Sequence, residues 1–217
     1  MARKLHIHSR SAGQNPYAHA GRALARRDPI LRQVIRRVGP CTLRPVNDVL
    51  TVLVRTIISQ QLATRAAQTI TNRLLARLPK PLSIESLEQL DDADYRACGI
   101  SEPKRCAIRD LCRHGRLGKV PLHSSPDTLT DDQWRQALLS IRGIGPWSVD
   151  MFFIFGLGRL DVFPVGDLGL RLGVQTTYGL PALPTTTELN EIGERWRPYR
   201  SVATWYMWRC RGPVPQS

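Results

Sequence analysis

The chain has 217 residues, enough for one sizeable domain or two small lobes that each bury a core. It carries 31 Lys and Arg against 18 Asp and Glu, and the net charge of +13 indicates a polyanionic partner, with an anionic membrane surface as the alternative. Apolar runs fall short of the roughly 18 residues of a membrane span, and five scattered cysteines without a C-x-x-C pair disfavour a zinc ribbon and a disulfide framework.

The first part of the chain is expected to be a basic tail over residues 1–20, followed by a folded domain over residues 21–217. No apolar segment of a secretory signal is visible in this tail, and reduced thiols fit a cytoplasmic protein. Helical sequence follows from Arg22 to Val38 and is interrupted at Asp28-Pro29, because proline suits the first turn of a new helix.

Capping residues predict where the next helices begin. Asn47 or Asp48 can begin a helix whose inner face is lined by leucine and isoleucine. The other expected starts are Thr64, Ser83, Asp91, Ser101 and Asp131. No stretch shows the clear period-two alternation of a strand, so the sequence predicts an all-α fold.

Residues 141–145, Ile-Arg-Gly-Ile-Gly, are typical of a tight hairpin between two helices. Gly143 and Gly145 permit positive φ and have no Cβ, so backbone N–H groups can approach an anion closely. Pro146 suits the first turn of the helix that follows, and a helix start of this kind can bind a DNA phosphate. A simple turn without a ligand is the alternative for the two glycines.

A single aspartate, Asp167, follows one apolar helix later and is flanked by Gly166 and Gly169. A carboxylate near a backbone anchor could serve chemistry on the sugar of a nearby nucleotide. The alternative role is a helix N-cap, and the two roles are compatible. Asp150 and Asp161 are the competing acids.

Three blocks of sequence resemble a known family. They are residues 57–67, residues 99–104, and the hairpin segment 144–147 together with 161–170. Through these blocks the chain resembles the helix-hairpin-helix DNA glycosylase superfamily, and within it the 3-methyladenine DNA glycosylase II group in a compact form without the N-terminal β lobe. The likeness covers roughly residues 23–208.

The resemblance implies two helical lobes with a DNA-binding cleft between them, one of roughly residues 47–150 and the other of residues 21–46 plus 151–217. It also implies that the hairpin, with Gly143 and Gly145, grips the DNA backbone. The partner would be double-stranded DNA that contains damaged bases, and we expect a monomer without membrane attachment.

The resemblance assigns Asp167 as the catalytic residue. It places Leu62 as a wedge that enters the minor groove when a nucleotide is flipped out, with Gln61 beside it. The alternative for Leu62 is an ordinary core leucine. Gln60, the neighbour of Gln61, is expected to face elsewhere.

Trp147 and Trp208 fall at positions that line the base pocket in the family, and Trp205 or Tyr199 is a further candidate for stacking on the base. An aromatic pocket suits a cationic base such as 3-methyladenine, since cation–π contacts contribute about 0.5–2 kcal/mol each. The alternative for a tryptophan on a helix is core packing, which we expect for Trp134 and Trp196.

The resemblance also bears on cofactors. Relatives coordinate a monovalent cation through hairpin carbonyls, which would place Ile141 and Ile144 near such an ion. Bifunctional relatives carry a lysine where this chain has Trp147, so Schiff-base lyase chemistry has no evident nucleophile. Only Cys210 lies downstream of the hairpin, so the cysteine quartet of an iron–sulfur cluster is absent and no cofactor is expected to be required.

The sequence therefore predicts a monofunctional base excision repair glycosylase. It would hydrolyse the N-glycosidic bond of alkylated purines of the 3-methyladenine type and leave an abasic site. Two alternatives remain open at this point: a glycosylase for oxidised or mismatched bases, and a helix-hairpin-helix DNA-binding protein without catalysis.

Overall fold

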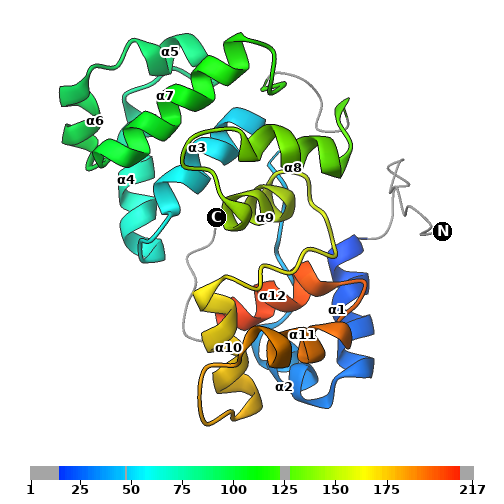
Figure 1. The fold of residues 1–217 in the computed structure, drawn as a ribbon. Coiled ribbons are helices and arrows are strands. Elements are labelled where there is room, and N and C mark those ends of the chain that lie inside the picture. The colour runs from blue at the N-terminus through cyan, green and yellow to red at the C-terminus, as the bar shows by residue number, and fades with distance from the viewer. Residues whose placement is uncertain (1–14, 47, 123–127, 211–217) are drawn as a thin grey trace.

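The computed structural model describes residues 15–46, 48–122 and 128–210. Within these ranges the protein is built from α-helices and contains no strand, which confirms the predicted all-α class (Figure 1). The first helices are α1 (Pro16–Arg27), α2 (Pro29–Val38), α3 (Val49–Ser59), α4 (Thr64–Ala76), α5 (Ile84–Glu88) and α6 (Asp92–Cys98). They are followed by α7 (Glu102–Arg116), α8 (Asp131–Leu139), α9 (Pro146–Phe155), α10 (Leu168–Tyr178), α11 (Thr186–Glu194) and α12 (Arg200–Arg209).

Most helices begin at the residues that the sequence predicts as caps. The Asp48 side chain accepts a hydrogen bond from the Thr51 N–H at the start of α3, while Asn47 lies outside the described residues. Ser83 and Asp91 begin α5 and α6, each with a reciprocal capping box. These short polar caps therefore fix the helix boundaries.

Two predicted boundaries are wrong. Helix α1 begins at Pro16, behind an Asn15 cap, so residues 16–20 are helical rather than part of a tail; residues 1–14 lie outside the described residues. Helix α8 is capped by Thr130 instead of Asp131, because the Thr130 hydroxyl and the Gln133 side chain form a capping box.

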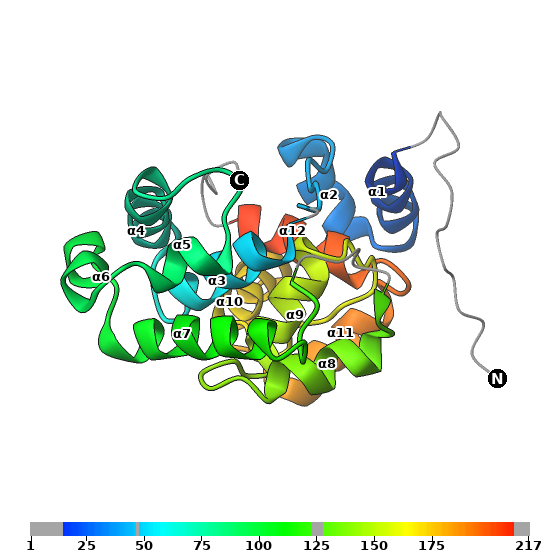
Figure 2. The ribbon, with the colours of Figure 1, turned by 90° about the horizontal axis from the view of Figure 1, so that it is seen from above.

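The helices pack around two hydrophobic cores (Figures 1 and 2). Helices α3 to α8 build the first core, and α1, α2 and α10 to α12 build the second. Helix α9 serves both, since Phe152 and Phe153 lie in the first core and Met151 and Ile154 in the second. Helix α9 thus lies where the two groups of helices meet. Among the described residues, no helix combines the length and apolar character needed to cross a membrane.

Candidate active site

The predicted hairpin joins α8 to α9 and is anchored by its two isoleucines. Ile141 and Ile144 are buried in the first core, and the Ile144 N–H donates to the Ile141 carbonyl at 3.1 Å. Between them Gly143 is exposed and has a φ of +80°, a value that favours glycine. Gly145 is the N-cap of α9, and Pro146 is its first residue. Buried side chains therefore hold an exposed turn of backbone at a helix start, as phosphate binding requires.

Helix α7 supports the hairpin from behind. A Cβ on Gly143 would lie 3.0 Å from the Cβ of Ala107, so the hairpin backbone packs closely on this helix. The Asp110 carboxylate accepts the Arg142 N–H at 2.8 Å. Burial acts to raise the pKa of Asp110, but this N–H and the Arg113 guanidinium lower it overall. Asp110 thus stays an acceptor that fixes the hairpin to α7.

Asp167 is the N-cap of α10 and also the centre of a cluster of N–H donors. Its Oδ1 atom accepts the Leu170 N–H at 2.5 Å, and the residue is only 9% exposed. The Trp147 indole Nε1 donates to Oδ2 at 2.8 Å, and the Trp208 indole Nε1 donates to Oδ1 at 2.7 Å. Asp167 is therefore a helix N-cap, and the same carboxylate is the candidate catalytic group.

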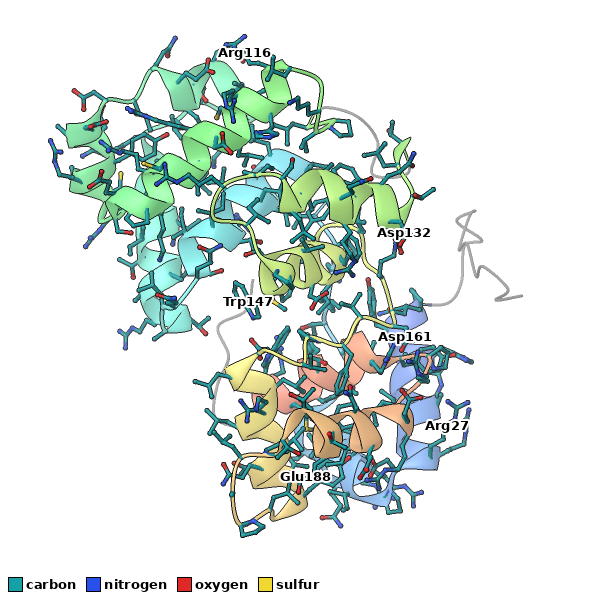
Figure 3. The ribbon with its side chains drawn as sticks, in the orientation of Figure 1. Arg27, Arg116, Asp132, Trp147, Asp161 and Glu188 are labelled. Atoms are coloured by element: carbon teal, nitrogen blue, oxygen red, sulfur yellow. The ribbon has the colours of Figure 1, made fainter. Side chains whose placement is uncertain are left out.

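This cluster joins three parts of the fold. Trp147 lies in the first turn of α9, Trp208 near the end of α12, and Asp167 at the start of α10. In Figure 3 the labelled Trp147 lies between the two groups of helices. The structure therefore brings the three predicted site residues into direct contact, at the junction of the two cores.

Two neighbours of the cluster did not stand out in the sequence as site residues. The Phe155 ring stacks on Trp208, with ring centroids 5.7 Å apart and planes inclined by 16°. A Cβ on Gly169 would lie 3.0 Å from Trp208 Cδ1 and 3.1 Å from Asp167 Oδ1. Glycine at position 169 thus makes room for the indole that binds the carboxylate. Gly169 is visible in the sequence two residues after Asp167, but only the structure shows that Trp208 fills the space beside it.

The remaining tryptophans belong to the cores. Trp134 and Trp196 are fully buried, as predicted. Trp205 is 3% exposed, and the Arg209 guanidinium lies over its ring at 3.5 Å from the centroid. Its face is already covered, so the expectation that Trp205 stacks on a base is wrong.

The competing acids are engaged elsewhere. Asp150 lies 3.7 Å from the Arg135 guanidinium, and burial raises its pKa to about 6 although Arg135 opposes this. Asp161 forms an ion pair with Arg200 at 2.8 Å. Asp167 is therefore the acid of the three that the two indoles hold.

The predicted wedge lies in the turn before α4, residues 61–63, which we call the wedge turn. Gln61 has a φ of +55°, unusual for a residue with a side chain, and is exposed. Leu62 is 38% exposed, which excludes the alternative of a core leucine. An exposed apolar side chain on a tight turn is suited to enter a DNA groove.

Gln60 precedes these two residues and is bound to the hairpin. Its Nε2 atom donates to the Gly143 carbonyl at 2.7 Å and to the Ser148 hydroxyl at 2.9 Å. Gln60 is bound to the hairpin, whereas Gln61 is exposed, and the partners of Gln60 could not be read from the sequence because they lie more than 80 residues away.

The sequence is similar to those of known DNA repair proteins. Residues 54–198 match the family described as HhH-GPD superfamily base excision DNA repair protein. The alkylbase DNA glycosidase-like protein mag2 of Schizosaccharomyces pombe is 28% identical over 198 residues, which cover 89% of this chain and 93% of that protein. DNA-3-methyladenine glycosylase 1 of the same organism is 33% identical over 162 residues, 72% of this chain and 70% of the relative.

A solved structure gives the same result for the fold. The Schizosaccharomyces pombe 3-methyladenine DNA glycosylase Mag1, in complex with abasic DNA, superimposes with a TM-score of 0.80. The two chains are 30% identical, and the match covers 88% of this chain and 95% of the other. A 3-methyladenine glycosidase from Bacillus halodurans is also similar, with a TM-score of 0.69 and 32% identity over 89% of each chain.

Proposed function

The chain belongs to the HhH-GPD superfamily of base excision DNA repair proteins, and we propose that it hydrolyses the N-glycosidic bond of alkylated purines in double-stranded DNA. The products are the free base and an abasic site. The observation that carries this proposal is the Asp167 carboxylate, held at the junction of the two cores by the indoles of Trp147 and Trp208. Relatives named 3-methyladenine DNA glycosylases support the alkylated substrate class.

Reaction begins with a base that must leave the duplex. Flipping a nucleotide costs a few kcal/mol of stacking and pairing, and Leu62 on the wedge turn is placed to fill the gap. Phosphate contacts at Gly143 and Gly145 would hold the backbone beside the site. The hairpin and the wedge turn thus supply binding, while the cluster around Asp167 supplies the chemistry.

An N-alkylated purine is cationic and leaves as a neutral base, so the reaction needs little general acid. As the C1′–N bond breaks, positive charge develops on the sugar, and the Asp167 carboxylate stabilises it. Water then attacks C1′ and loses a proton to the carboxylate or to solvent. An indole that donates its in-plane N–H keeps its ring faces for stacking, and cation–π contact with Trp147 favours a cationic base by about 0.5–2 kcal/mol.

The test is base release from methylated DNA by Asp167→Asn. We expect a decrease of about 100-fold or more, the usual effect of removing a group that stabilises transition-state charge. Asp150→Asn is the matched control, because Asp150 pairs with Arg135 and not with the indoles. Undiminished release by Asp167→Asn removes the mechanism. A mass-spectrometric inventory of bases released from methylated and from oxidised DNA fixes the substrate class.

We also propose that the enzyme is monofunctional. Trp147 occupies the place of the lyase lysine, and an indole has no primary amine that could form a Schiff base with the sugar. Borohydride added during turnover should therefore trap no covalent enzyme–DNA adduct. Strand cleavage without added base or amine would contradict this proposal.

The hairpin is the candidate site of a monovalent cation. The Ile141 oxygen uses one of its two lone pairs for the Ile144 N–H, which leaves the other for a ligand. We propose that Ile141 and Ile144 would hold such an ion, whose charge would favour the approach of a phosphate. Replacing K⁺ by tetramethylammonium at constant ionic strength should weaken DNA binding, and equal affinity in both salts would refute the site.

A further inference from the structure

We infer that Gln60 is a positioning residue that couples the phosphate-binding hairpin to the wedge turn. The inference rests on the proposed function, since it concerns how that function is assembled. Gln60 itself touches neither the base nor the reacting sugar in this assignment. It acts through its neighbours Gln61 and Leu62.

The first support is the bond pattern of the Gln60 side chain. A primary amide nitrogen carries two hydrogens, and Gln60 Nε2 has two acceptors, the Gly143 carbonyl and the Ser148 hydroxyl. Gly143 is the left-handed residue of the hairpin, and Ser148 lies buried in the first turn of α9. One side chain therefore links the end of α3 to the turn of the hairpin and to the helix that follows it.

The second support is the position of α7 behind both elements. The Lys104 Nζ donates to the Ile58 carbonyl at 2.7 Å, shortly before the wedge turn. Ala107 packs against Gly143, and Asp110 accepts the Arg142 N–H. These three α7 residues are spaced by three, so they lie along one side of the helix. Helix α7 holds the wedge turn and the hairpin from one side, and Gln60 closes the connection between them.

The consequence is a fixed distance between the phosphate-binding hairpin and the Leu62 side chain. The wedge turn contains a strained residue, Gln61, and an exposed leucine, so it needs external bonds to keep one conformation. When the hairpin binds a phosphate, the Gln60 bond to Gly143 fixes where Leu62, two residues further along the chain, lies relative to that phosphate. Loss of the Gln60 donor should therefore reduce wedge insertion while the hairpin still binds DNA.

The experiment is a double-mutant cycle read by binding rather than by base release. Gln60→Met keeps the length of the side chain and removes both N–H bonds. Its affinity is measured for an intact duplex and for one with a stable abasic analogue, with 2-aminopurine beside the analogue to report unstacking. The cycle is completed by Leu62→Ala and by the double variant.

We expect Gln60→Met to lower the preference for the abasic duplex about fivefold to tenfold and to lower the 2-aminopurine signal with it. The affinity for the intact duplex should change less than about twofold. In the Leu62→Ala background the same change should add less than about twofold. The matched control is Gln68→Met, since Gln68 donates only within α4, to Asn72. Gln60→Glu places carboxylate oxygens, which can only accept, against the Gly143 carbonyl. It should therefore lower the preference for the abasic duplex more than Gln60→Met does.

Three results would overturn the inference. The first is an effect of Gln60→Met on the preference for the abasic duplex that adds fully to the effect of Leu62→Ala. The second is an equal loss of affinity for the intact and the abasic duplex, and the third is no change in either affinity. Should Gln60→Met melt before binding is measured, Ser148→Ala removes one of the two acceptors and should give a smaller loss of the same kind. Since no base release is measured, an enzyme that proves inactive on methylated DNA would refute the proposed function without deciding this inference.

Discussion

Replacing Trp208 with phenylalanine removes one of three N–H donors to the Asp167 carboxylate and keeps an aromatic ring in place. Phenylalanine retains the stacking on Phe155 but cannot donate to Oδ1. A hydrogen bond to a charged group contributes about 1.5–3 kcal/mol. If the transition state loses this whole free energy, the rate of base release decreases about 10- to 150-fold.

The assay is single-turnover release of 3-methyladenine from a methylated duplex at saturating enzyme, so that binding does not limit the rate. Trp205→Phe is the matched control, because Trp205 is a core residue whose ring is covered by Arg209. It should leave the single-turnover rate within about twofold of the wild type, even with a lower melting temperature. A Trp208→Phe rate equal to the wild type would show that the indole N–H does not orient the carboxylate.

Three further substitutions test neighbouring parts of the structure. Gly169→Ala should lower base release about tenfold or more, because the new methyl group would lie 3.0 Å from Trp208 and displace it; unchanged release would contradict this packing. Gly143→Ala should weaken affinity for an undamaged duplex more than Gly145→Ala does. Gly143 has a φ of +80° and packs closely on Ala107, whereas a Cβ on Gly145 would meet nothing within 4 Å. Equal affinities of the two variants would refute a role for this turn. Asp150→Asn should raise the free energy of unfolding by about 1–2 kcal/mol at pH 8, because burial raises the pKa of Asp150 to about 6, above that of the unfolded chain, so that ionisation of this carboxyl costs stability that a neutral amide does not lose. The gain should vanish below about pH 3, where the carboxyl is protonated in both states, and a gain that is the same at both pH values would refute burial as its cause.

Local signals predicted most of the fold. Asp48, Ser83 and Asp91 begin helices because their side chains satisfy N–H groups within three residues, an interaction encoded by neighbours in the chain. The same logic explains the error at Asp131, where two adjacent residues could both cap and only the reciprocal bond with Gln133 decides for Thr130.

The site was predictable in its members but not in its contacts. Asp167, Trp147 and Trp208 were identified through the resemblance, yet nothing in their spacing indicates that both indoles donate to one carboxylate. The partners of Gln60 depend on how α3 packs beside the hairpin, which is a tertiary result. Trp205 shows the converse error, since its place on α12 does not reveal that Arg209 covers its ring.

Helix α9 has a consequence for how the protein denatures. Adjacent residues of this one helix enter different cores, Phe152 and Phe153 on one side and Met151 and Ile154 on the other. Neither group of helices can unfold without exposing apolar side chains of α9 to water, which also destabilises the other group. Heat or urea should therefore melt both in a single cooperative transition, and a damaged copy would lose its whole structure rather than persist as a half-folded DNA-binding fragment.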